Sequence, residues 1–380
     1  MNATTNATAA TGLGGYDRYG VGVNQMAAGS LFELYDSCGF LYPAKREQLA
    51  PVWNRVADSW DRSLAAPTSD YLHHCLAFGD QGSNCWGSVS VWRSTLGRVQ
   101  AQHLVSVGDP LASRSVMLAA QESLNRAGFR SIENWFRGSN KYANRIFGTA
   151  PAALGDSQAA VETRELLAVT DPPSDARRPA ARVDRLDDAG GREARAALAG
   201  FAHPVIADAE ELDSGDIELA DLDAMYHRVG LHRRRSVYLA HLEGHGAPVG
   251  IACAYRGPVG INFSFLENRC DLWLDAGLGE EERSAVARGL LRRAQADYAD
   301  CPLPQMLVAC DVATARVIQT TCGGRPVRTY KRCVWLRGGF WDWYRHVDSF
   351  YQKALRLRQR RERRPAAPRR GTLAAVGAPA

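Results

Sequence analysis

One order of helix and strand patterns occurs twice in this chain, first in residues 30–150 and again in residues 201–346. Each copy starts with a helical pattern, continues with short apolar strands, and then has a longer helix, a strand and a short helix. In the first copy the longer helix is expected at 113–129, and in the second at 280–299. In the second copy, residues 257–267 are expected to form one of the strands. The repeat predicts a duplicated α+β unit.

The segments outside the two copies differ from them in composition. Residues 1–29 are rich in Ala, Thr, Asn and Gly and are expected to be disordered. Residues 151–200 include the sequence DPPSDARRPAARVDRLDDAGG and are predicted to be a linker. Residues 347–380 are predicted to form a basic helix and tail. The aromatic stripe at the start of that helix is expected to pack on the second copy.

The charge of the chain is concentrated near its C-terminal end. Residues 353–370 contain nine Lys or Arg and one Glu, so the net charge of +5 leaves −3 for residues 1–352. The nine cysteines include no Cys-x-x-Cys pair, which favours reduced thiols over a zinc site. There is no secretory signal pattern and no long uncharged apolar run. We therefore expect a cytoplasmic protein without a transmembrane segment or a metal site.

The order of elements resembles two tandem units of the GNAT superfamily of N-acyltransferases. The resemblance includes a strand followed by Asn or Asp, a short helix and Gly, at residues 140–148 (NKYANRIFG) and 311–323 (DVATARVIQTTCG). It implies a mixed, mostly antiparallel sheet with flanking helices in each unit. It also implies a gap between two central strands, where an acyl thioester such as acyl-CoA meets an amine acceptor.

A family member would hold the pyrophosphate of CoA in the loop before the longer helix. In the second copy this loop contains Gly277 and Gly279, but three glutamates follow and disfavour an anion. In the first copy Ser113, Arg114 and Ser115 occupy the equivalent position and offer donors to an anion. We predict that any CoA-type anion binds the first copy.

Catalysis in such a unit requires a base for the amine and an acid for the leaving thiolate. His103 lies in the strand before the longer helix of the first copy, and Tyr142 lies in its short helix. The second copy offers Glu267, Asp311 and Tyr330. The bland alternatives are ordinary packing for His103 and Tyr142, and helix capping for Asp311.

Three functions are compatible with these features. The first is an N-acyltransferase that uses acyl-CoA or a carrier-bound thioester and a small amine. The second is a tRNA-dependent aminoacyltransferase of the Fem type, which needs no CoA loop and would use the basic tail to bind tRNA or another anionic partner. The third is a binding module of the same fold without catalysis.

Overall fold

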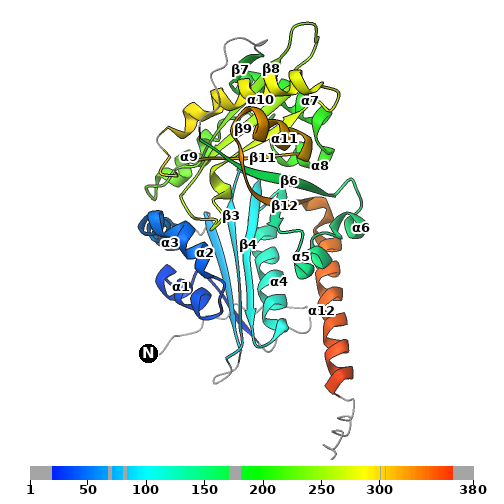
Figure 1. Cartoon of the computed structure of the whole chain (residues 1–380). Coiled ribbons are helices and arrows are strands. Elements are labelled where there is room, and N and C mark those ends of the chain that lie inside the picture. The colour runs from blue at the N-terminus through cyan, green and yellow to red at the C-terminus, as the bar shows by residue number, and fades with distance from the viewer. Residues whose placement is uncertain are drawn as a thin grey trace, which may run out of the picture.

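The computed structural model describes residues 19–66, 71–79, 84–170, 181–299, 301–303 and 305–362. Within these ranges, twelve strands form one continuous sheet in the order β1-β2-β3-β4-β5-β12-β6-β11-β10-β9-β8-β7 (Figure 1). The predictions for residues 1–18, for the tail beyond residue 362 and for residues 171–180 lie outside the described residues.

The first unit comprises residues 19–169. Its strands are β1 (Gly20–Val23), β2 (Leu72–Phe78), β3 (Trp86–Arg93), β4 (Arg98–Val107), β5 (Ser131–Phe136) and β6 (Ala159–Val169). Its helices are α1 (Ala28–Ser37), α2 (Pro43–Leu49), α3 (Trp53–Ala65), α4 (Pro110–Arg126), α5 (Lys141–Ile146) and α6 (Ala150–Leu154). The sheet is antiparallel except for the parallel pair β4 and β5, which α4 connects.

The second unit comprises residues 182–336 and repeats this order. Its strands are β7 (Arg182–Leu186), β8 (Arg234–His241), β9 (Gly250–Arg256), β10 (Arg269–Leu274), β11 (Met306–Cys310) and β12 (Arg325–Leu336). Its helices are α7 (Gly191–Phe201), α8 (Pro204–Ala209), α9 (Ala220–His227), α10 (Glu280–Gln295) and α11 (Val312–Thr321). Strands β10 and β11 form its parallel pair, connected by α10. Helix α12 (Phe340–Glu362) follows the second unit.

The two units exchange their last strands at the centre of the sheet. Strand β12 of the second unit pairs with β5 of the first, whereas β6 of the first unit pairs with β11 of the second. Strands β6 and β12 also pair with each other, from Ala159↔Trp335 to Ala168↔Arg325. Each unit is therefore completed by a strand from the other.

Helices cover both faces of the sheet (Figure 1). In the first unit α1–α3 lie on one face, and α4, α5, α6 and α12 lie on the other. The strands supply alternate residues to the two faces, as their period of two requires. For example, Cys75 and Ala77 of β2 pack under α4, and Leu72 and Leu76 pack under α1–α3. No helix in the described ranges combines the length and the apolarity needed to cross a membrane.

Three expectations about the arrangement are wrong. Residues 159–169 are not linker but the central strand β6, and β7 and nearly all of α7 also lie within the segment 151–200. Residues 257–265 form turns and irregular backbone rather than a strand, with positive φ angles at Gly260 and Phe265, and a short 3-10 helix follows at Leu266–Asn268. The aromatic stripe of α12, which includes Tyr344 and Tyr351, packs on the first unit rather than the second. The first and third errors concern the place of β6 in the sheet and the packing of α12, which a local pattern does not specify.

Candidate active site in the first unit

The parallel pair β4 and β5 separates partway along its length. Pairing runs from Arg98↔Ser131 to Ala101↔Asn134 and then stops, although β4 continues to Val107. His103 has a φ of 54°, which is uncommon for a residue other than glycine, and the register with β3 shifts at this point. This β-bulge bends β4 away from β5 and leaves one edge of β4 unpaired.

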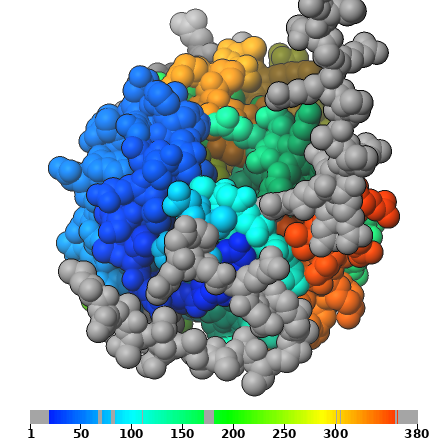
Figure 2. Space-filling model, turned by 90° about the horizontal axis from the view of Figure 1, so that it is seen from below, coloured from blue at the N-terminus to red at the C-terminus, as the bar shows by residue number. Residues whose placement is uncertain are grey.

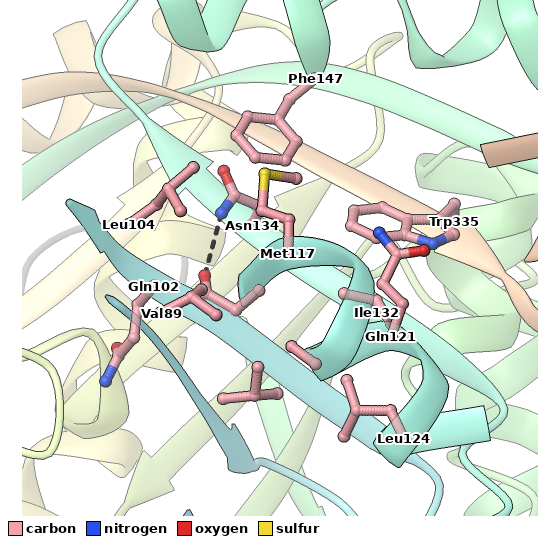
Figure 3. A pocket seen from close by; sticks show the side chains of 13 residues that line it. Val89, Gln102, Leu104, Met117, Gln121, Leu124, Ile132, Asn134, Phe147 and Trp335 are labelled. Carbon is pink, nitrogen blue, oxygen red and sulfur yellow. Dashed lines mark hydrogen bonds between the residues drawn. The ribbon is translucent and has the colours of Figure 1, made fainter. Parts of the chain in front are cut away.

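Two cavities meet at this gap. A small cavity of about 30 Å³ lies between β4, β5 and α4 (Figure 3), and a larger pocket of about 480 Å³ lies beside it. Both are lined by Gln102, Leu104, Asn134 and Phe147. The amide of Asn134 donates to the carbonyl of Ala101 at 2.9 Å and closes the ladder where the gap begins (Figure 3).

The larger pocket is lined from both faces of the sheet. Phe40 and Tyr42 belong to the α1–α3 face, whereas Tyr142 and Ala143 belong to α5 on the opposite face. Viewed from below, the blue α1–α3 layer and the green segment that includes α5 lie on either side of a hollow in the surface (Figure 2). The gap between the strands is thus a passage through the sheet.

His103 lines this pocket and is held between aromatic rings. Its ring stacks on Phe263 at 4.3 Å and on Trp60 at 5.7 Å between centroids. Burial, together with the positive charge of Lys45, holds the pKa of His103 well below its usual value. The imidazole is therefore neutral at neutral pH, and it could accept a proton only from a strongly acidic donor.

Tyr142 reaches the same pocket from α5. Its hydroxyl hydrogen-bonds the hydroxyl of Tyr351 on α12 and lies 3.8 Å from the sulfur of Met117. Burial raises the pKa of Tyr142, so its phenol keeps its proton at neutral pH. The structure thus brings His103 and Tyr142 into one pocket.

The second unit supplies part of the wall. Tyr330 of β12 lines the pocket and makes an edge contact with Trp135 of β5, at 6.1 Å between ring centroids. The amide of Asn262 donates to Gln102 Oε1 at 2.6 Å. Tyr330, which the sequence associates with the second unit, therefore belongs to the first unit's pocket because β12 is exchanged.

Three cationic side chains at the pocket were not singled out from the sequence. Lys45 lies on α2, Arg137 follows β5, and Arg328 lies on β12. They come from segments up to 283 residues apart by their numbering, and each is unremarkable in its own segment. No local motif signals their convergence.

The predicted anion-binding group of the first unit is engaged by α12 instead. Arg114 Nε donates to Asp348 at 2.8 Å, and the hydroxyl of Ser113 is 2.7 Å from that of Tyr351. Ser115 donates back to the carbonyl of Leu111. All three side chains are at least 95% buried. The expectation that they offer donors to a ligand is wrong, because α12 covers the start of α4.

The glycine loop of the second unit is also engaged within the chain. Gly277 N donates to Asp275 at 2.8 Å, and Gly279 N donates to Glu282 at 3.0 Å. The carboxylates of Asp275 in the loop and of Glu282 in the first turn of α10 therefore take the backbone donors that a phosphate would need. The predicted conflict with the glutamates is explained by this capping arrangement.

The remaining two predicted residues lie away from the pocket lining. Asp311 caps α11 by accepting from Ala313 N and Thr314 N at 2.8 and 3.0 Å. Glu267 is fully buried and accepts from Gly260 N at 2.6 Å, and its burial raises its pKa to about 7. Neither side chain is brought together with His103 and Tyr142.

The equivalent gap in the second unit is closed by Arg164. Its guanidinium comes from β6 and donates to the carbonyl of Leu272 on β10 at 2.9 Å and to that of Ala309 on β11 at 2.6 Å. The side chain is 97% buried and stacks on Trp273. Only the first unit therefore keeps an open gap among the described residues. In the same ranges, no three His, Cys, Asp or Glu side chains are grouped as metal ligands.

The topology is that of two GNAT-like units in tandem, in agreement with the resemblance found in the sequence. No protein-family model and no curated protein matches the chain. Among solved structures, the chain is similar to a tandem GNAT protein from the clavulanic acid biosynthesis pathway, with 10% identity and a TM-score of 0.36 over 76% of this chain and 95% of that one.

Two further solved structures resemble the chain at the same level. One is a Drosophila protein, with 10% identity and a TM-score of 0.41 over 82% of this chain and 97% of that one. The other is a putative acetyltransferase from Pyrococcus horikoshii, with 12% identity and a TM-score of 0.39 over 83% and 89%. At these scores the reaction has to be argued from the site.

Proposed function

We propose that the first unit transfers an acyl group from a thioester to an amine in the passage between β4 and β5. The observation that carries this proposal is the end of the β4–β5 ladder at Ala101↔Asn134, beside the bulge at His103. An unpaired strand edge next to a pocket can bind an extended chain that carries amide groups, as in strand addition. A thioester on such a chain would then be held beside the amine.

The residues of the pocket fit the proton transfers of this reaction. The amine nitrogen attacks the thioester carbon, the bond between carbon and sulfur breaks, and the nitrogen loses a proton. Neutral His103 accepts that proton from the cationic adduct, which is far more acidic than a free ammonium ion. Tyr142 gives its proton to the departing thiolate, and solvent restores both groups.

The contacts at the starts of the two longer helices bear on which acyl donor the protein uses. The hydrogen-bond donors at the start of α4 are engaged by Asp348 and Tyr351, and those of the loop before α10 by Asp275 and Glu282. A donor bound by a pyrophosphate at either loop would have to displace these contacts. This favours a donor held mainly by its acyl arm, and it keeps a carrier-bound thioester or an aminoacyl ester of tRNA as alternatives to acyl-CoA.

The test combines the purified protein with acyl-CoA thioesters, an acyl-phosphopantetheine and a panel of primary amines, with products detected by mass spectrometry. We expect amide formation that depends on both substrates and falls about 100-fold in Tyr142→Phe. Tyr238→Phe is the matched control, since its phenol binds Asp297 in the second unit. Aminoacyl-tRNA is the remaining donor to test.

If the folded protein forms no amide from any thioester or from aminoacyl-tRNA, the catalytic proposal is wrong. Thermal unfolding with each donor then decides whether the pocket only binds, because a ligand at 100 times its Kd stabilises the fold by about 2.7 kcal/mol. Stabilisation without turnover would favour a binding module.

A further inference from the structure

Three positive side chains face the larger pocket, and none of the described residues that line it is Asp or Glu. Lys45 and Arg328 are half-buried, and Arg137 is exposed at the pocket mouth. Lys45 lies on α2, which belongs to the α1–α3 face, and Arg137 is joined to that face through Tyr42. The positive charge is therefore gathered on one side of the passage.

The three cations contact phenols and aromatic rings rather than carboxylates. Arg137 donates to the hydroxyl of Tyr42 at 2.5 Å, and Arg328 is 3.4 Å from that of Tyr330. The ammonium of Lys45 lies 4.2 Å from the ring centre of Phe40. Within the described chain, no carboxylate forms an ion pair with any of the three cations.

Three buried arginines elsewhere in the sheet show a contrast, whereas Arg235 on β8 donates, among the described residues, only to the backbone carbonyls of Ile217 and Glu210. Arg98, Arg269 and Arg332 are each paired with at least one buried carboxylate. Unpaired cations in a partly buried pocket repel one another. Burial and the neighbouring Arg137 and Arg328 lower the pKa of Lys45 to about 8. A negatively charged ligand would relieve this repulsion.

We propose that these three side chains bind the anionic group of the acceptor, so that the acceptor is a small amine that also carries a carboxylate or a phosphate. That the bound molecule is the acceptor rests on the proposed function, whereas the binding of an anion at this site does not. The guanidinium groups of Arg137 and Arg328 suit the oxygen pairs of either anion. Aromatic rings beside them, including Phe40 and Trp135, would contact the apolar part of the same molecule.

The experiment measures binding by titration calorimetry with four probes: glycine, β-alanine, O-phosphoethanolamine and ethanolamine. The first two carry a carboxylate, the third a phosphate, and the fourth no anion. We expect at least one of the anionic amines to bind and ethanolamine to bind at least tenfold more weakly. Comparing the affinity for glycine and β-alanine with that for O-phosphoethanolamine shows whether the site prefers a carboxylate or a phosphate.

Lys45→Met and Arg328→Gln should each weaken binding of that anionic amine about tenfold or more. Arg345→Gln is the matched control, because Arg345 is exposed on α12 and paired with Asp342. Thermal unfolding without ligand establishes that each variant is folded. If the two pocket variants bind as tightly as the control, or if ethanolamine binds as tightly as the anionic amines, the proposal is wrong.

Turnover separates this proposal from the proposed function. Binding of the anionic amine without amide formation would keep the anion site and reject acyl transfer. Amide formation that is as fast with ethanolamine as with the anionic amines, and unchanged in Lys45→Met and Arg328→Gln, would keep acyl transfer and reject the anion site.

Discussion

Arg332 on β12 donates two hydrogen bonds to one carboxylate oxygen of Glu133 on β5, at 2.9 and 2.5 Å, although the two residues are 199 positions apart. Both side chains are fully buried. Arg332 also contacts Glu210, and Glu133 accepts from Arg269 at 3.1 Å. This network joins the two units where their last strands are exchanged.

Replacing Glu133 by Gln should destabilise the fold by about 3–5 kcal/mol, because it leaves buried guanidinium charge without a full counterion. Urea unfolding followed by circular dichroism measures the change. Asp342→Asn, which removes the carboxylate of an exposed pair on α12, should change stability by less than about 1 kcal/mol. Similar effects in the two variants would contradict the role of the network.

Because of the Glu133 carboxylate, the stability of the fold should depend on pH in the acidic range. The neighbouring arginines lower the pKa of Glu133 to about 2, compared with an ordinary value of 4.5. Below about pH 4.5 Glu133 binds a proton in the unfolded chain but not in the folded chain. The stability of the fold therefore decreases as the pH falls towards 2. The stability gap between the native protein and Glu133→Gln should therefore be full above pH 5 and shrink below it.

Arg164 should stabilise the fold by filling the gap of the second unit, and it should not contribute to catalysis. In Arg164→Met the carbonyls of Leu272 and Ala309 lose their donor, which should cost about 1–3 kcal/mol for each unsatisfied group. Because the first unit holds the open gap, amide formation at a temperature where the variant is folded should stay within about twofold of the native rate. If the rate of amide formation falls in Arg164→Met but not in Tyr142→Phe, the reaction takes place in the second unit.

The rate of transfer should follow the protonation of the acceptor amine rather than that of His103. Because His103 is already neutral, kcat/KM should rise about tenfold per pH unit between 5.5 and 7.5, with no break near the ordinary histidine pKa of 6.5. The measurement uses a saturating thioester and an amine whose own pKa is above 9. A break near 6.5 would show that His103 titrates normally in the active protein.

Anion affinity should weaken as the pH rises through about 8, where Lys45 loses its proton. Arg137, Tyr42 and Tyr330 also line this part of the pocket. The pKa of Arg328 is raised above its ordinary value, so this guanidinium stays charged, and the low pKa of His103 keeps its ring neutral. Acetate is a suitable probe, because its own charge is constant from pH 6 to 10. In Lys45→Met the affinity should be weaker and flat across this range.

Removing residues 363–380 should leave transfer from a small thioester within about twofold of the native rate, since α12 ends at Glu362 and the pocket lies in the first unit. The same truncation removes four arginines. It should reduce the salt dependence of any binding to single-stranded tRNA segments, by a slope of about 0.7 for each lost phosphate contact. Transfer from aminoacyl-tRNA that is lost on truncation would support the Fem-like alternative.

The sequence by itself determined the elements and their repetition. Apolar periodicity over a few residues predicts strands such as β3 and helices such as α4, and it places His103 and Tyr142 on the elements that border the gap. Asp311 as a helix cap is likewise a local property, because the donors it satisfies lie two and three residues along the chain. These inferences depend only on neighbours in sequence.

The tertiary structure alone decided which residues share the pocket. Strand pairing joins segments almost 200 residues apart, and nothing in the local pattern of β6 or β12 states which unit each strand completes. The exchange carries Arg328 and Tyr330 to the first unit's pocket, and it carries Arg164 into the second unit's gap. Arg114 likewise pairs with Asp348 on α12, so its guanidinium is not available to a ligand. Charge and shape at the site are thus fixed by long-range packing, which a single sequence does not reveal.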